Sequence, residues 1–253
     1  MPVDYNVIWD QVSPGWVAFV RGPEATQLRD GVLKPVIEEL LGPVSGKRVL
    51  DAGCGEGEMC RWLAGLGAKV TGADISNAML EAARAQEEQT KLGITYQQCS
   101  IVDLGTLGEF DMVVSNQVLS VVPDHAEAFQ SIYKALKTGG QAVVTITHPM
   151  FDGVGPGWVE HAPEDTRWWA NRYMARVDGV GAHGAPTYHR SFSDYISAAI
   201  EAGFVLTGFR EPVASEEYSR KQPPQTWSHD RIPTLAALRL RKDRTAPGPK
   251  SAA

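Results

Sequence analysis

The stretch Val49-Leu50-Asp51-Ala52-Gly53-Cys54-Gly55-Glu56-Gly57 decides the fold. The short apolar run at residues 48–50 predicts a buried parallel strand, and a helical pattern follows over residues 59–66. Between them, glycine stands at every second position. Strand, glycine turn and helix make the opening βα unit of a nucleotide-binding sheet, because glycine adopts positive φ and lets a ligand contact the backbone. The helix start then offers free N–H groups to a polar or anionic ligand.

A second predicted strand, residues 69–73, ends in Asp74. This acid lies about twenty residues after the glycine loop, the spacing at which a carboxylate meets a ribose diol in such folds. A carboxylate accepts hydrogen bonds from both hydroxyls and repels a 2′-phosphate. The sequence therefore predicts a ligand with a free ribose.

The glycine spacing separates two classes of nucleotide site. Dinucleotide sites use G-x-G-x-x-G, whereas this loop reads D-x-G-x-G-x-G, which argues against a nicotinamide-dependent dehydrogenase. The stretch VLDAGCGEGEMCRWLAGLGAKVTGADIS, residues 49–76, strongly resembles the first two strands of the class I methyltransferases that use S-adenosylmethionine. The alternative to a cofactor site is that the glycine loop is an ordinary tight turn and that Asp74 is a surface residue.

The resemblance implies specific cofactor contacts. In that family, the positions of Asp51 and of the loop Gly53 to Gly57, including Cys54 and Gly55, hold the methionine part, while Asp74, followed by Ile75, holds the ribose. Many relatives place an acid at the position of Ser100, where it meets the adenine amino group. Here Ser100 would accept that hydrogen bond more weakly, and the backbone N–H of Ile101 would serve a ring nitrogen.

Residues 1–45 are expected to form a helical cover over the sheet. In the resembled family such helices close over the cofactor, and a Tyr or Arg there often contacts it, so Tyr5 and Arg29 are candidates. The alternative is that both only pack or face solvent.

The whole chain, at 253 residues, suits one α/β domain with insertions. We expect a doubly wound, mostly parallel, seven-stranded Rossmann-like sheet with one antiparallel edge strand. A single methyltransferase domain would span residues 1–242, with a lid insertion at 150–190 and a disordered tail at 243–253. The remaining strands are expected at residues 94–98, 110–115, 141–147, 204–211 and 234–241.

Composition restricts the partners. The formal charge is −6 without a Lys- or Arg-rich run, which argues against nucleic acid. The cysteines Cys54, Cys60 and Cys99 form no C-x-x-C pair, so we expect a reducing cytoplasm and no metal site. The first residues lack a positive start and an apolar core, so we expect no signal peptide, and no apolar run approaches the roughly 20 residues that cross a membrane. Whether a homodimer completes the pocket stays open.

Methyl transfer needs an aligned nucleophile and a group that removes its proton. Strand ends meet at one edge of such a sheet, so Asn116 and His148 are expected to share a pocket with the glycine loop. His148 is the candidate base, because imidazole titrates near neutrality, or else it supports the strand end. His189 and Tyr5 are further candidates.

The cover and the insertion are rich in aromatic residues, which suggests a lidded pocket for a flat or apolar small molecule. These residues are Trp9, Trp16, Trp158, Trp168, Trp169 and Tyr173. The predicted function is methyl transfer from S-adenosylmethionine to a small, aromatic or apolar molecule of secondary metabolism, such as an indole-like ring, at C, N or O. The alternatives are a non-catalytic S-adenosylmethionine-binding partner subunit and a protein or nucleic-acid methyltransferase.

Overall fold

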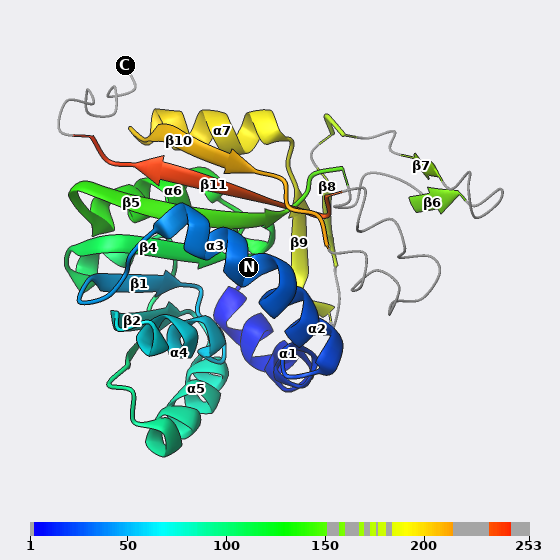
Figure 1. Cartoon of the computed structure of the whole chain (residues 1–253). Coiled ribbons are helices and arrows are strands. Elements are labelled where there is room, and N and C mark those ends of the chain that lie inside the picture. Colours follow the sequence, from blue (N-terminus) through cyan, green and yellow to red (C-terminus); the bar gives the residue numbers. More distant parts are fainter. Residues whose placement is uncertain are drawn as a thin grey trace.

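A computed structural model describes residues 3–150, 157–159, 167–169, 173–175, 177–180, 184–214 and 233–243. Its centre is a seven-stranded sheet (Figure 1). The strands are β1 (Arg48–Ala52), β2 (Lys69–Asp74), β3 (Thr95–Gln98), β4 (Phe110–Asn116), β5 (Leu136–Thr147), β10 (Val205–Arg210) and β11 (Leu235–Arg241). They lie in the order β10-β11-β5-β4-β1-β2-β3, and the five strands from β3 to β5 in this order are parallel. The predicted doubly wound sheet is confirmed.

The predicted antiparallel strand is present as β11, but it lies one position in from the edge. It pairs antiparallel with β5 on one side and with β10 on the other. Five of its seven residues are buried, whereas no residue of β10 is. An apolar strand buries more apolar surface when a strand pairs with it on each side, so β11 lies inside the sheet and the more exposed β10 forms its edge.

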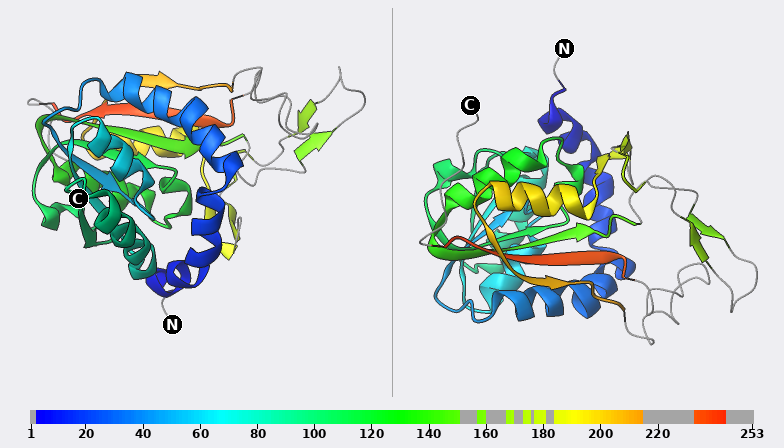
Figure 2. Two further views of the ribbon diagram at one scale, coloured as in Figure 1. Left: turned by 60° about the horizontal axis from the view of Figure 1, so that its bottom comes forward. Right: turned by 90° about the horizontal axis from the view of Figure 1, so that it is seen from above.

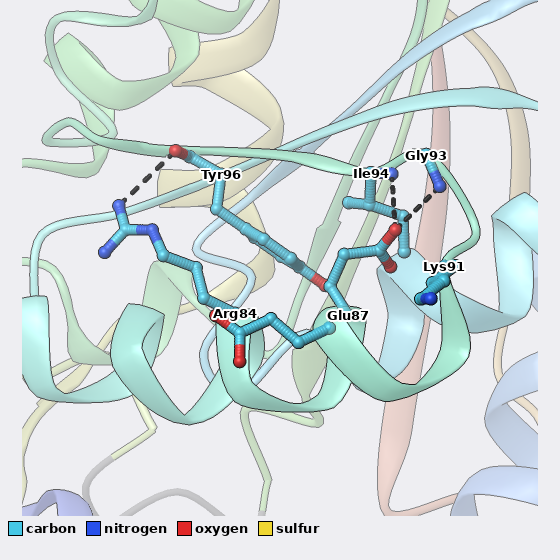
Figure 3. A pocket seen from close by; sticks show the side chains of 7 residues that line it. Arg84, Glu87, Lys91, Gly93, Ile94 and Tyr96 are labelled. Carbon is cyan, nitrogen blue, oxygen red and sulfur yellow. Dashed lines mark hydrogen bonds between the residues drawn. The ribbon is translucent and has the colours of Figure 1, made fainter.

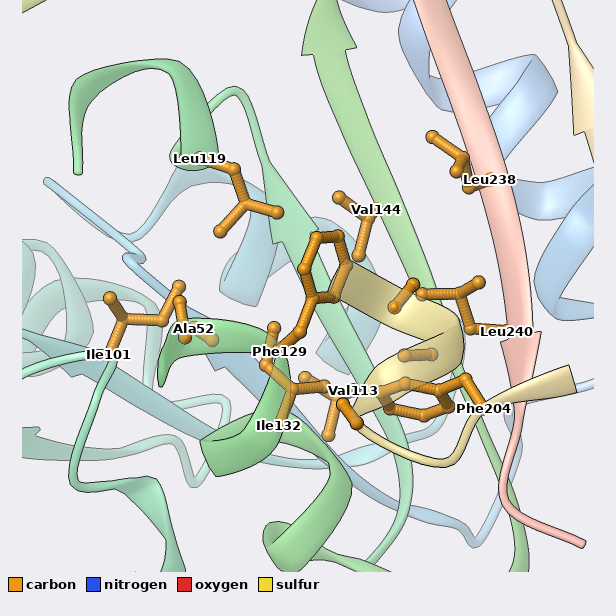
Figure 4. Packing of buried hydrophobic residues seen from close by; sticks show 14 of the residues in the cluster. Ala52, Ile101, Val113, Leu119, Phe129, Ile132, Val144, Phe204, Leu238 and Leu240 are labelled. Carbon is orange, nitrogen blue, oxygen red and sulfur yellow. The ribbon is translucent and has the colours of Figure 1, made fainter. Parts of the chain in front are cut away.

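Helices cover both faces of the sheet (Figure 2). One face carries α6 (His125–Ala135) and α7 (Phe192–Glu201), and the other carries α3 (Lys34–Leu41), α4 (Glu58–Gly65) and α5 (Asn77–Thr90). On the α6 face, Phe129 and Ile132 pack with Val144 of β5 and Leu240 of β11 (Figure 4). Burial of these apolar side chains on both faces fixes the sheet between the two layers.

Several helices begin at the caps that their sequences provide. Ser76 accepts a hydrogen bond from the N–H of Met79 and is thereby the N-cap of α5. Ser191 and Asp194 form a capping box at the start of α7. At the other end of α5, Glu87 accepts from the N–H groups of residues 93 and 94 and closes the turn into β3 (Figure 3).

The chain before β1 forms α1 (Tyr5–Val20), α2 (Pro23–Leu28) and the π-helical turn η1 (Arg29–Leu33), which continues into α3. The arrows of β1 and β5 point toward α1 and α2 (Figure 1). The N-terminal helices therefore lie at the carboxyl ends of the parallel strands, where such sheets bind ligands.

Short elements complete the described chain. They are η2 (Leu104–Leu107), η3 (Leu119–Val121), and two small antiparallel pairs, β6 (Gly157–Val159) with β7 (Arg167–Trp169) and β8 (Val177–Val180) with β9 (Pro186–His189). The side chains of Trp158, Trp168 and Trp169, much of the expected lid and residues 244–253 of the expected tail lie outside the described residues. Among the helices that the structure describes, none is long and apolar enough to cross a membrane.

Candidate active site

A cavity of about 640 Å³ opens between the carboxyl ends of the parallel strands and helices α1 and α2. Its volume lies within the range typical of small-molecule sites. All the residues predicted to contact a cofactor line it except Gly57, namely Asp51, Gly53, Cys54, Gly55, Asp74, Ile75, Ser100, Ile101, Asn116 and Arg29. The structure therefore brings these residues, which come from four strand ends and the cover, into one space.

The glycine loop has the conformation that its sequence predicts. Gly53, Gly55 and Gly57 have φ values of 81°, 53° and 81°. A Cβ atom on Gly53 would lie 2.4 Å from Cγ2 of Val118, so a side chain there would collide with the loop after β4. Gly57 starts α4 without a side-chain cap, which leaves N–H groups of the first turn free for another acceptor. Its own role is to turn the chain.

Two carboxyl groups flank this loop, the buried Asp51 and the partly buried Asp74. Asp74 accepts hydrogen bonds from the N–H of Gly55 at 2.8 Å and of Ser76 at 2.9 Å, while burial raises its pKa. Asp51 accepts from the thiol of Cys60 at 3.1 Å. Burial raises the pKa of Asp51 to about 7, and the negative charges of Asp74 and Glu58 act in the same direction. Both carboxyl groups therefore hold a proton more tightly than a carboxyl group in water does.

Helix α1 is fastened to the cofactor side of the cavity by contacts that sequence reasoning missed. The carboxylate of Asp10 accepts from the hydroxyl of Ser76 at 2.6 Å and from the N–H of Ala78 at 3.1 Å. Arg21 and Arg61 each lie 2.7 Å from the buried carboxylate of Glu56, inside the glycine loop. Glu56 was visible as an acid within the loop, but no local pattern names its partner Arg21, 35 residues earlier.

Arg29 lies at the start of the π-helical turn and faces the first turn of α4. Its Nε atom lies 2.9 Å from the carboxylate of Glu58, which also pairs with Lys34 at 2.8 Å. Its Nη1 donates to the carbonyl of Val20. These contacts hold the guanidinium on the wall of the cavity beside the glycine loop.

Aromatic side chains of α1 line the opposite wall. Trp9 and Trp16 meet edge to face with ring centroids 5.8 Å apart, and Phe19 continues the row. Tyr5 lines the cavity as well, and its hydroxyl lies 2.6 Å from that of Tyr188 in β9. This aromatic wall, predicted for the cover, has the shape and polarity that suit a flat, apolar ligand.

The two candidate histidines are placed differently from Tyr5, since neither His148 nor His189 is among the residues that line the cavity. The Nε2 atom of His148 lies 2.8 Å from the carboxylate of Glu211, and its Nδ1 accepts from the N–H of Met150. The Nε2 atom of His189 lies 2.8 Å from the carbonyl oxygen of Tyr173. In this arrangement both rings support the backbone around them.

Polar groups at the end of β4 and on α6 complete the cavity. Gln117, a residue that the sequence did not single out, has a φ of 60° and bonds to Thr145 and Thr147 of β5. Asp124 and Glu127, also missed, are two acidic residues among those that line the cavity. Within the described part of the chain, no group of three or more His, Cys, Asp or Glu side chains could hold a metal ion.

Comparisons with known proteins agree with this geometry. The family described as "Methyltransferase domain" matches residues 50–144. A crystal structure of an S-adenosylmethionine dependent methyltransferase from Mesorhizobium loti is 30% identical, with a TM-score of 0.71, and the match covers 82% of this chain and 96% of that one.

Curated relatives point to the same family. A ubiquinone biosynthesis O-methyltransferase of Bordetella bronchiseptica is 36% identical over 181 residues, which are 69% of this chain and 68% of the relative. One of the same name from Alkalilimnicola ehrlichii is 35% identical over 109 residues, 42% of this chain, and the chain spans only 44% of its length. Glycine loop, strand order and relatives together show that the chain belongs to the class I S-adenosylmethionine-dependent methyltransferases.

Proposed function

We propose that this protein transfers the methyl group of S-adenosylmethionine to an oxygen atom of a small aromatic molecule. One observation carries the proposal: a single cavity joins the glycine loop and Asp74 to the aromatic wall formed by Trp9, Trp16 and Phe19. The names of the relatives, ubiquinone biosynthesis O-methyltransferases, support oxygen as the acceptor atom. We also propose that residues 1–242 act as one methyltransferase domain.

The residues on one side of the cavity fit the cofactor. No atom lies within 4 Å of the position that a Cβ atom of Gly55 would take, so a ligand can approach the backbone of the loop there, and the carboxylate of Asp74 suits the two ribose hydroxyls. Asp51 and Arg29, an acidic and a basic residue that both line the cavity, would border the amino acid moiety. Ser100 and Ile101 would border the adenine. When bound, S-adenosylmethionine supplies a methyl group on a positively charged sulfur, which makes that methyl electrophilic.

The charges of the cavity bear on the class of acceptor. Asp124 and Glu127 line it, whereas its cationic residue, Arg29, is already paired with Glu58. A carboxylated or phosphorylated acceptor would meet unfavourable charges here, and an uncharged aromatic ring would not. The proposed acceptor is therefore a neutral phenol-like molecule.

Removal of the acceptor's proton requires a base within reach of the cavity. Asp124 and Glu127 are among the residues that line it, and Tyr5 offers a hydroxyl that is bonded to Tyr188. For His148 to act as the base, its ring would have to leave Glu211 and turn. Their place on the cavity favours Asp124 or Glu127, at the start of α6, over His148 for this step.

The proposal is tested first by calorimetric titration with S-adenosylmethionine, S-adenosylhomocysteine and NAD. We expect the adenosyl ligands to bind, NAD not to bind, and Asp74→Ala to abolish binding. Asp111→Asn, at the amino end of β4 and paired with Lys137, is the matched control and should bind as the wild type does. Radiolabelled methyl transfer to phenol, catechol and indole then follows. Cofactor binding without transfer to any ring would instead support a non-catalytic partner subunit.

A further inference from the structure

Polar side chains at the ends of β4 and β5 form a hydrogen-bonded chain that ends in the cavity. From its direction we propose that Asn116 presents a fixed N–H donor to the oxygen atom of the acceptor, and that this donor selects the acceptor. This inference rests on the proposed methyl transfer to oxygen and names the residue that would decide it. It assigns Asn116 to the acceptor rather than to the cofactor.

This series of hydrogen bonds begins on β5. The hydroxyl of Thr147 donates to Oε1 of Gln117 at 3.0 Å, which fixes the orientation of that amide. The Nε2 group of Gln117 then donates to Oγ1 of Thr145 at 3.3 Å. The backbone N–H of Gln117 is shared between the carbonyl oxygen of Thr145, at 3.0 Å, and the same Oγ1, at 3.2 Å.

The hydroxyl of Thr145 continues the series by donating to Asn116. Its Oγ1 receives two N–H donors, so its one hydroxyl proton is available for the acceptor that lies 2.7 Å away, Oδ1 of Asn116. Thr145 is fully buried, so water does not compete for this proton. The amide oxygen of Asn116 is therefore occupied, and the orientation of its amide follows from the network.

The Nδ2 group of Asn116 is the last donor in this series of hydrogen bonds. Asn116 lines the cavity, and in the ranges that the structure describes no acceptor is bonded to Nδ2. The left-handed conformation of Gln117 is rare for a residue other than glycine and persists where the surroundings dictate it. Here it puts both the backbone N–H and the side chain of Gln117 on Thr145.

A group that can only donate recognises a lone pair. A phenol or phenolate oxygen supplies one, and a hydrogen bond to the ionised oxygen also favours loss of the phenol proton. An alkylammonium group or an indole N–H would meet the donor with a donor and leave both unsatisfied. The donor thus favours oxygen acceptors in a cavity whose carboxylates would otherwise suit amines.

The test uses 4-nitrocatechol as the probe, because its visible absorption reports its ionisation. Protein saturated with S-adenosylhomocysteine is titrated at constant pH. We expect the wild type to bind the probe and shift its spectrum toward the ionised form. Asn116→Asp, which replaces the donor with a carboxylate oxygen, should weaken probe binding at least tenfold and abolish the spectral shift. Its affinity for S-adenosylhomocysteine should stay within about twofold of the wild-type value.

Variants of Thr145 test the direction of the chain. Thr145→Val frees the amide of Asn116 to turn and should weaken probe binding by about three- to tenfold. Thr145→Ser keeps the hydroxyl and should bind the probe as the wild type does. The assignment is overturned if Asn116→Asp weakens the binding of S-adenosylhomocysteine as much as it weakens the binding of the probe. It is also overturned if all variants bind the probe equally, or if the wild type binds indole but not 4-nitrocatechol. Failure of the wild type to bind S-adenosylhomocysteine would instead remove the proposed function.

Discussion

Arg21, the C-cap of the first helix, and Glu56 of the glycine loop form an ion pair whose Nη2 and Oε2 atoms lie 2.7 Å apart. The carboxylate is almost fully buried, and Arg61 holds its other oxygen. The cover is thus attached to the loop proposed to hold the methionine part of the cofactor, and the contact can be tested separately from the glycines.

Arg21→Ala should lower the affinity for S-adenosylhomocysteine by roughly three- to tenfold, because α1 loses its hold on the loop while Arg61 keeps Glu56 paired. Calorimetric titration measures the effect. Arg210→Ala is the control, since it removes an exposed ion pair with Glu39 far from the loop and should leave the affinity unchanged. Equal affinities for Arg21→Ala and the wild type would show that this pair does not shape the site.

Gly53→Ala should reduce cofactor binding by more than about tenfold and destabilise the protein by about 1–3 kcal/mol, because the new Cβ would lie 2.4 Å from Val118 at a φ of 81°. Titration and chemical denaturation measure the two effects. Gly65→Ala, at the end of α4 with no atom within 4 Å of the new Cβ, should bind normally and be equally stable or more stable by up to about 1 kcal/mol. Similar losses in both variants would contradict the steric argument.

Asp51→Asn should flatten a pH dependence of stability. The folded protein binds the Asp51 proton more tightly, with a pKa of about 7 against 3.8 without burial. The free energy of unfolding therefore falls as the pH rises between these values and is level on either side. At about 1.36 kcal/mol per pKa unit, the effect reaches a few kcal/mol at most. Denaturation at several pH values measures the free energy of unfolding of the variant and of the wild type. If Asp51 did not titrate in this window, the plots of the two free energies against pH would run parallel.

Asp10→Ala should loosen the first turn of α5, because the N–H of Ala78 and the hydroxyl of Ser76 lose their acceptor. A loss of about 1 kcal/mol is expected, as for other helix caps. Hydrogen exchange of residues 76–80 should become faster. Asp4→Ala, which removes the cap of α1 itself, should leave exchange in α5 as it was. Unchanged exchange in the Asp10 variant would mean that Asp10 does not stabilise this helix start.

The parts of the fold that follow local patterns could be predicted from the sequence. The strand before the glycine loop, the positive φ at Gly53 and Gly57 and the cap at Ser76 depend on neighbouring residues alone. The inward position of β11 could not be read in the same way. It depends on competition between two late strands for the place beside β5, which burial decides.

The candidate site was predictable where strand ends meet and not where distant partners decide. His148 has the chemistry of a base, yet its ring nitrogen is paired with Glu211, 63 residues later. The orientation of the Asn116 amide depends on Thr145, 29 residues away, through the register between β4 and β5. No spacing rule in a single sequence reports such a pairing.

The first helix is tied down at three separate places, through Asp10 to α5, through Arg21 to the glycine loop and through Tyr5 to β9. Because its aromatic face forms a wall of the cavity, spent cofactor would leave only when these ties open together. Exchange of product for fresh cofactor would then be timed by an opening motion rather than by bond making. Turnover should accordingly slow as solvent viscosity increases, and to the same degree for fast and slow acceptors.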